Sequence, residues 1–266
     1  MRLPFKSLLR SFERWISVFG FSARHLLLPW PHLKSFWVDY FRLAGELTPD
    51  WPITPSFPCL GEKSEAAGGA SGAYFHQDFL VARKIFERNP RRHIDVGSRV
   101  DGFVAHVATF RPIEILDIRP CRSFHPNAIF QVADLSNLAT VPRSCCDSAS
   151  CLHALEHFGL GRYGDPIGAN HWKSGLTALS LMLESGGRLY LSVPIGRQRV
   201  EFNAHRVFHV STILQQASSC SLLLDAFSLV DDAGDLHAEI PASKVDDTIS
   251  KNLIFGCGIF EFHKSG

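Results

Sequence analysis

The sequence has no excess of charge of either sign, and this limits its partners. Among 266 residues, Lys and Arg together number 27 and Asp and Glu number 26. A general nucleic-acid-binding protein would carry a basic surplus gathered on one face. We therefore expect no nucleic-acid partner.

The sequence also lacks paired cysteines and long hydrophobic runs. Its seven cysteines include no C-x-x-C pair, so neither a disulfide framework nor a thiolate zinc site is indicated. Free thiols in a reducing, cytoplasmic compartment fit this pattern. The longest apolar run, Leu26 to Trp30, contains Pro29 and is too short to span a bilayer. No secretory signal is visible.

Composition divides the chain into three segments. Residues 1–47 place apolar side chains at helical spacing, and we expect amphipathic helices there. An aromatic face with Phe12, Trp15 and Phe19 lies beside basic residues, a pattern that suits a membrane interface. This segment is expected to pack on a membrane surface, on a second subunit or on its own domain. The basic residues are Arg2, Lys6, Arg10 and Arg14.

Residues 48–72 are rich in Pro and Gly and predict a linker, whereas residues 73–266 alternate strand and helix patterns. A helix with Phe75, Phe79 and Ile85 on its apolar face is expected to end at Asn89-Pro90. The alternation predicts a Rossmann-like α/β domain with a mostly parallel, doubly wound sheet. Expected strands are 93–96, 113–118, 128–132, 148–152, 188–194, 227–230 and 255–262, and expected helices are 103–110, 173–184 and 211–224.

Acidic residues follow three successive predicted strands, at Asp95, Asp117 and Asp134. In an open parallel sheet, ligands bind outside the carboxyl ends of the strands, and a carboxylate after the second strand can hold a ribose diol. Gly97 and Gly102 flank the first turn, where a missing side chain lets the backbone approach a ligand. Any one of these acids alone fits a helix cap, but their matching positions indicate a nucleoside-binding site.

Five segments in this order resemble the motifs of class I S-adenosylmethionine-dependent methyltransferases, and three longer ones are similar to a family called domain of unknown function 268. The first set is Asp95-Val-Gly97, Leu116-Asp117-Ile118, Ala133-Asp134-Leu135, Leu155-Glu156-His157 and the run Gly186 to Pro194. The second set is Asp95 to His106, Ser150 to Pro166 and Asn203 to Phe208. The resemblance covers about residues 60–264 and leaves the N-terminal segment outside.

The resemblance implies S-adenosylmethionine as cofactor. Asp95, Gly97 and Ser98 would then face its methionine part, Asp117 its ribose, and Asp134 with Leu135 its adenine. One departure is clear, because the first turn reads Gly97-Ser-Arg-Val-Asp-Gly102 and lacks the family's usual middle glycine. Gly102, Ile118 and His153 complete the expected cofactor site.

Two other classes of protein share parts of this sequence pattern. His153-Ala-Leu-Glu156-His157 fits the H-x-x-E-H pattern of zinc hydrolases, which needs a sustained helix to bring both imidazoles to one metal. The strand predicted just before it and the glycines just after it argue against such a helix, so we assign no metal ligands. A nicotinamide-binding protein is disfavoured because the first turn has no G-x-G-x-x-G sequence.

The segment from His153 to Trp172 concentrates polar side chains after a predicted strand, where α/β proteins place reacting groups. We expect methyl transfer to an oxygen of a small molecule or glycan, with His157 as the proton acceptor and His205 as the second choice. A methyltransferase-like protein that binds without turnover is the alternative. The expected catalytic set is His157, His205, Glu156, Asp165 and Tyr163.

Overall fold

The computed structural model describes residues 30–51, 53, 59–60, 67–121 and 125–266, and it divides the chain into two units, residues 1–69 and 70–266. In the first unit, α3 (Trp30–Glu46) confirms the expected N-terminal helix. Trp37 and Phe41 are exposed on it. The amphipathic pattern of residues 1–29 lies outside the described residues. None of the described helices is both long and apolar enough to cross a membrane.

Among the residues described in the second unit, eight strands form one sheet in the order β3-β2-β1-β4-β5-β10-β8-β9. The first five strands in the chain run parallel to one another. The strand β10 lies antiparallel between β5 and β8, and β9 lies antiparallel to β8. Their bounds are β1 His93–Val96, β2 Ile113–Asp117, β3 Ala128–Val132, β4 Cys146–Leu152, β5 Leu183–Ile195, β8 Leu222–Val230, β9 Leu236–Ile240 and β10 Gly256–Lys264.

The strand order reverses at β1, which pairs with β2 on one side and with β4 on the other. Chain connections leave this point in opposite directions, so the carboxyl ends of β1 and β4 border a crevice. The expected mostly parallel, doubly wound sheet is confirmed.

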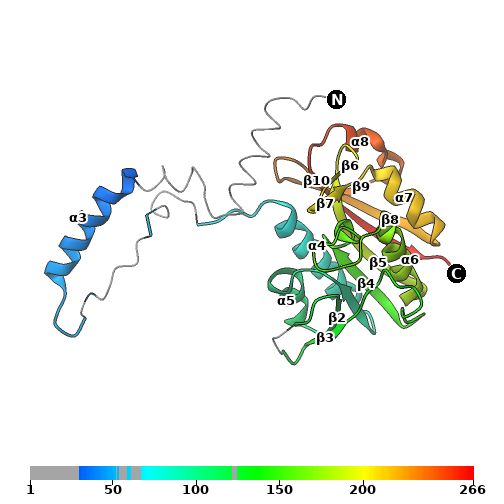
Figure 1. Ribbon diagram of the computed structural model, residues 1–266, viewed down its shortest axis with the longest axis horizontal. Coiled ribbons are helices and arrows are strands. Elements are labelled where there is room, and N and C mark those ends of the chain that lie inside the picture. The colour runs from blue at the N-terminus through cyan, green and yellow to red at the C-terminus, as the bar shows by residue number, and fades with distance from the viewer. Residues whose placement is uncertain (1–29, 52, 54–58, 61–66, 122–124) are drawn as a thin grey trace. The chain divides into compact units, whose positions relative to one another are not determined.

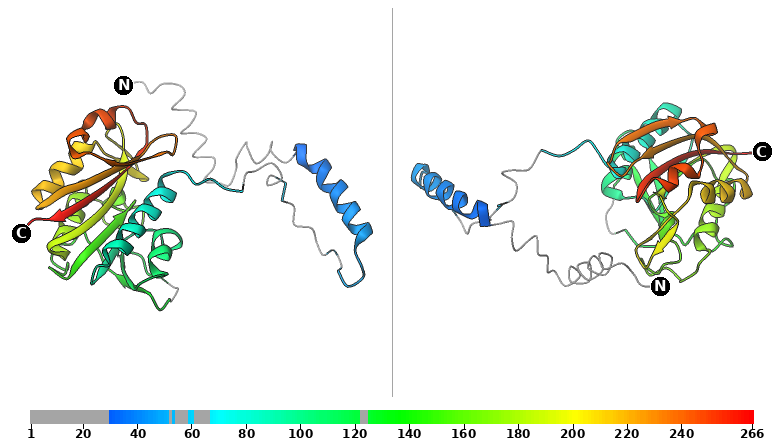
Figure 2. Two further views of the ribbon diagram at one scale, coloured as in Figure 1. Left: turned by 180° about the vertical axis from the view of Figure 1, so that it is seen from behind. Right: turned by 90° about the horizontal axis from the view of Figure 1, so that it is seen from above.

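Helices cover both faces of the sheet. Figure 1 shows α4 (Ala73–Arg88) and α5 (Ala105–Ala108) on one side, and α6 (His171–Met182) and α7 (Val210–Ser219) on the other. Side chains alternate between faces along a strand, so β5 sends Leu189 and Leu191 to the core under α6 and α7 and Tyr190 to the core under α4. The strands lie between these helix layers (Figure 2).

The buried face of α4 differs from the expected one. Ile85 is buried as predicted, and the helix ends at Asn89 in the left-handed region, but Phe75 and Phe79 are exposed. Gln77 and Asp78 take the inner positions instead. Burial of these polar groups is tolerated because Gln77 donates to Asp78 and accepts a hydrogen bond from Ser192.

Several helices and short strands differ in extent from the sequence prediction or were not predicted. The expected helix 103–110 is a π-helical turn, Val100–Val104, followed by α5. The helix α6 ends at Met182, before Glu184, because Leu183 already pairs with Cys146 in the sheet. The expected helix 211–224 ends at Ser219, since β8 begins at Leu222. The hairpin of β6 (Arg199–Glu201) and β7 (His205–Val207) and the helix α8 (Asp247–Lys251) are too short to show a period. The strand β9 was not predicted either, although Leu236, Ala238 and Ile240 alternate with polar residues in it.

Candidate functional site

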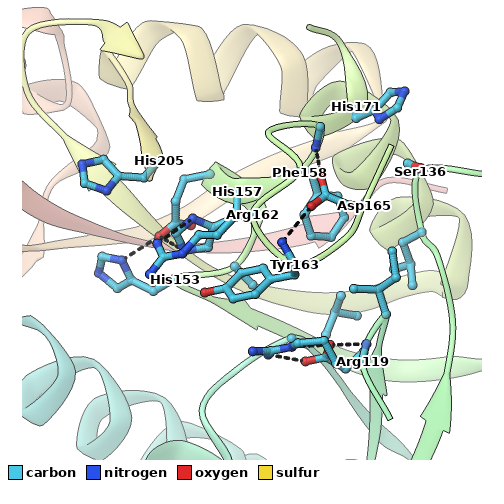
Figure 3. A pocket seen from close by; sticks show the side chains of 18 of the residues that line it. Arg119, Ser136, His153, His157, Phe158, Arg162, Tyr163, Asp165, His171 and His205 are labelled. Atoms are coloured by element: carbon cyan, nitrogen blue, oxygen red, sulfur yellow. Dashed lines mark hydrogen bonds and ion pairs between the residues drawn. The ribbon is translucent and has the colours of Figure 1, made fainter. Parts of the chain in front are cut away.

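A cavity of about 390 Å³ opens at the carboxyl ends of β1, β2 and β4, a volume in the range of small-molecule sites. Eleven of the fourteen residues expected from the sequence line it. Figure 3 labels His153, His157, Tyr163, Asp165 and His205 among them. Residues that sequence reasoning did not place there include Tyr74, Arg119 and Phe255. The eleven are Gly97, Asp117, Ile118, Asp134, Leu135, His153, Glu156, His157, Tyr163, Asp165 and His205.

The other three expected residues, Asp95, Ser98 and Gly102, do not line the cavity. The Asp95 carboxylate is fully buried and accepts hydrogen bonds from the Ser98 amide and hydroxyl and from the Ser150 hydroxyl. Burial raises the pKa of Asp95 to about 6, although these hydrogen bonds oppose the rise. Asp95 therefore shapes the first turn from behind, and it does not line the cavity in this structure.

The two glycines of the first turn, Gly97 and Gly102, are each required by a different close contact. Gly97 has φ +70°, and a Cβ on it would lie 2.9 Å from the Cβ of Ala154 across the crevice. A Cβ on Gly102 would lie 2.6 Å from Oδ2 of Asp78 on α4. Gly97 thus keeps the cavity wall bare, whereas Gly102 lets the turn pack on α4.

The Asp117 carboxylate is already paired in the structure. It accepts hydrogen bonds from the Arg119 backbone amide at 2.8 Å and from its guanidinium at 2.9 and 2.7 Å. The guanidinium lies 4.3 Å from the centre of the Tyr163 ring, within cation–π distance. Arg119 thereby links the end of β2 to the loop after β4. Its only sequence signal is a charge two residues beyond the expected ribose ligand.

Asp134 lies two residues beyond the end of β3 and caps its own turn. Its Oδ1 accepts hydrogen bonds from the Ser136 amide and hydroxyl. Ile118 and Leu135 give this part of the cavity an apolar lining.

The H-x-x-E-H segment does not form a helix that shares a metal. His153 follows the end of β4 with φ +51°, and Leu155–His157 form one 3₁₀ turn. Among the described residues, no group of three His, Cys, Asp or Glu side chains is placed to hold a metal ion.

His153 and Glu156 instead form a buried pair, with His153 Nδ1 2.9 Å from Glu156 Oε1. Burial opposes charge on His153, but neighbouring Cys257 and Glu156 raise its pKa well above the ordinary value. Burial likewise opposes charge on Glu156, yet His153 holds its pKa below the ordinary value. The buried Glu156 Oε2 and His153 Nε2 have no hydrogen-bond partner among the residues described.

His157 is held in one tautomer by a carbonyl. Its Nδ1 donates to the Ala204 carbonyl at 2.6 Å, so the neutral ring keeps its lone pair on Nε2. Burial lowers the pKa of His157, and Arg162 contributes to the decrease, although Glu156 opposes it. The contact that fixes this tautomer thus comes from the backbone of the turn between β6 and β7.

Asp165 and Arg206 shape the loop that carries Tyr163. The Asp165 carboxylate accepts backbone N–H groups of Gly159, Gly161 and Tyr163. Arg206 is buried and donates to the Phe158 carbonyl at 2.6 Å and the Glu156 carbonyl at 3.3 Å. The 3₁₀ turn and the loop are thereby fixed from the β6–β7 hairpin.

His205 also lines the cavity, and its ring centre lies 4.9 Å from that of Phe255. Its Nε2 lies 3.7 Å from a carboxylate oxygen of Glu201. Burial lowers the pKa of His205, so it too is neutral near pH 7.

Comparisons with known proteins agree with this geometry at the level of the fold. Residues 128–232 match the family model described as "Caenorhabditis protein of unknown function, DUF268", a shorter stretch than the resemblance noted above. No curated protein matches the sequence.

Among solved structures, a 1,6-didemethyltoxoflavin-N1-methyltransferase of Burkholderia thailandensis, with bound S-adenosylhomocysteine, superposes with a TM-score of 0.51 at 12% identity over 92% of both chains. The [4+2]-cyclase SpnF superposes with a TM-score of 0.50 at 13% identity, covering 71% of this chain and 81% of its own. The YcgJ protein of Bacillus subtilis gives 0.50 at 13% identity, covering 72% and 99%.

The strand order and these superpositions show that the chain has the fold of the S-adenosylmethionine-dependent methyltransferases, and residues 128–232 are similar to the DUF268 family model.

Proposed function

We propose that the protein is an S-adenosylmethionine-dependent methyltransferase that methylates a hydroxyl oxygen of a small molecule or glycan. The observation that carries this proposal is His157, a neutral imidazole on the cavity wall whose Nδ1–H is bound to the Ala204 carbonyl. Its Nε2 is therefore the nitrogen that can receive a proton.

The cavity fits the cofactor in three respects. Gly97 leaves bare backbone at the end of β1, Asp117 places a carboxylate at the end of β2, and Ile118 and Leu135 supply apolar surface for a base. When bound, S-adenosylmethionine would supply an electrophilic methyl group on a sulfonium. Asp117 is free to bind a ribose diol only after Arg119 has left it.

Methyl transfer to a hydroxyl needs positioning and a proton acceptor. His157 Nε2 takes the proton, and the resulting imidazolium lies 3.6 Å from Glu156 Oε1. Because that carboxylate is buried, its charge stabilises the imidazolium more than it would in water. His153, in turn, compensates the charge of Glu156 before the proton arrives. Tyr163 packs edge-on against the His157 ring at 5.5 Å and limits its rotation.

A second function is favoured by one observation. The Asp117 carboxylate is occupied by Arg119, and such a contact would persist in a methyltransferase-like protein that uses the fold for another purpose. The cyclase among the structural matches is a protein of this fold whose name does not include methyl transfer. A non-catalytic binding protein is therefore the alternative.

The test is methyl transfer by the full chain. Purified protein is incubated with S-adenosylmethionine carrying a labelled methyl group and with fractionated extracts of small molecules and glycans. We expect a labelled product whose methyl group is bound to oxygen, as identified by mass spectrometry. His157→Ala should lower the rate by about 10²- to 10⁴-fold, the usual cost of losing a general base, and change cofactor affinity little.

His237→Ala is the matched control, because His237 is exposed on β9 and pairs with Asp231 away from the cavity. It should retain the rate of the parent protein. A rate unchanged in both His157→Ala and His205→Ala would remove the assignment of the base. Cofactor binding without any labelled product would favour the non-catalytic alternative.

A further inference from the structure

Of the arginines that line the cavity in the described part of the chain, Arg99 and Arg119 bind carboxylates and Arg162 does not. Arg99 binds Asp101 at 2.8 Å, Arg119 binds Asp117 at 2.7 Å, and His153 binds Glu156. The carboxylates of Asp134 and Asp165 accept N–H groups of their own turns. Among the cavity residues that the structure describes, Arg162 is the cation that forms no ion pair with a carboxylate.

Arg162 is nevertheless held in place. Its Nη1 donates to the Ala204 carbonyl at 2.9 Å, the same oxygen that accepts the His157 Nδ1–H. Its guanidinium lies 5.2 Å from the centre of the Tyr163 ring. Figure 3 shows Arg162 beside His157, and Tyr163 between this pair and Arg119. The planar fork is thereby positioned next to the candidate base, with its remaining N–H groups available.

A ligand seated at His157 would remove water from this guanidinium. Burying a charge without a partner is strongly unfavourable, and a hydrogen bond to a neutral hydroxyl compensates only part of the hydration free energy that the guanidinium loses. A carboxylate or phosphate compensates more of it, because it accepts two parallel, charge-assisted hydrogen bonds. The charge balance of the cavity therefore favours an anionic acceptor over a neutral one.

We propose that Arg162 binds an oxyanion of the acceptor, a carboxylate or phosphate group carried near the hydroxyl that is methylated. The inference rests on the proposed function and names its substrate class. Arg162 is a specificity-determining residue, because it selects the acceptor by charge and leaves proton transfer to His157.

The test uses simple anions, so that the scaffold of the acceptor need not be known. The full chain is saturated with S-adenosylhomocysteine, and its thermal unfolding is followed in sodium phosphate, sodium acetate and sodium chloride at one ionic strength. An anion at about 30 times its dissociation constant should raise the midpoint by about 4 °C relative to chloride. A larger shift with acetate would indicate a carboxylate acceptor, and a larger shift with phosphate a phosphorylated one.

Three variants locate the effect. Arg162→Met should abolish the anion-specific shift, and Arg162→Lys should retain part of it because a charge remains without the fork. Arg143→Met is the matched control, since Arg143 is exposed and precedes β4 at the end opposite the cavity. It should leave the shift unchanged. Comparing shifts within each variant removes any general loss of stability.

Two results would overturn the proposal. The first is no shift with either anion in the parent protein, and the second is an equal shift in Arg162→Met. Absence of stabilisation by S-adenosylhomocysteine itself would count against the proposed function instead, and the anion measurement on the unloaded protein would still decide the role of Arg162.

Discussion

Replacing Arg119 should tighten cofactor binding, although the residue lines the cavity. Its guanidinium donates two hydrogen bonds to Asp117, the carboxylate expected to hold the ribose. The cofactor must displace that side chain, so the free energy of cofactor binding is less favourable by the free energy of the broken ion pair. In Arg119→Met, the new side chain can still pack on Tyr163, but it cannot donate hydrogen bonds to the Asp117 carboxylate.

The exposure of the pair sets the magnitude. The Arg119 side chain is 47% exposed and that of Asp117 is 15% exposed. Pairs with one exposed member contribute at most about 1 kcal/mol, which corresponds to about fivefold in affinity. We therefore expect Arg119→Met to lower the dissociation constant of S-adenosylhomocysteine about two- to fivefold. Asp117→Ala should raise it at least about tenfold, because hydrogen bonds to a charged group contribute about 1.5–3 kcal/mol each.

Isothermal titration calorimetry of both variants and the parent protein measures these changes, with circular dichroism to confirm folding. If a well-folded Arg119→Met binds the cofactor more weakly, Arg119 is a ligand-binding residue and does not compete with the ribose for Asp117. An unchanged affinity in well-folded Asp117→Ala would show that the ribose lies elsewhere.

Three further predictions concern other parts of the chain. His93 is buried, and burial lowers its pKa from the ordinary value of 6.5 to about 3. Between pH 6.5 and pH 3, His93 therefore binds a proton in the unfolded chain but not in the folded protein. The stability of the fold should decrease as the pH falls through this range. His93→Gln should flatten that slope in urea titrations, and an unchanged slope would assign it to other groups. Arg206→Met should lower stability by about 2 kcal/mol and speed proteolysis at residues 156–169, whereas equal proteolysis would mean that the loop is held without it. Full-length protein should co-sediment with anionic liposomes more than a chain starting at Thr48, and equal sedimentation would remove the proposed membrane contact of residues 1–47.

The fold was predictable because its signals are local and repeated. Short strand patterns such as His93–Val96 and Ile113–Asp117 alternate with helical patterns, and that alternation is compatible with few topologies. The small elements were not predictable in this way. The β6–β7 hairpin has three residues in each strand, too few for a period of two to be distinguished from chance.

The candidate site was predictable as a set of residues but not as a set of contacts. Side chains at the ends of β1, β2 and β4 had to meet, because the carboxyl ends of parallel strands share an edge. Which partner each one takes depends on loops. The Ala204 carbonyl that orients His157 is a backbone group and leaves no trace in the residue types.

The inward-facing residues of α4 show the same limit. Aromatic periodicity favoured Phe75 and Phe79, yet Gln77 and Asp78 are buried. A polar side chain takes an inner position when tertiary partners satisfy it, and the partners of Gln77, Ser192 on β5 and Cys257 on β10, lie far away in the sequence.

The cavity at the ends of β1, β2 and β4 should bind S-adenosylmethionine. Calorimetric titration of the full chain with S-adenosylmethionine and with S-adenosylhomocysteine measures this binding. We expect one site per chain for each ligand, with a dissociation constant that rises at least about tenfold in Asp117→Ala. No binding of either ligand at millimolar concentration to the folded parent protein would contradict it.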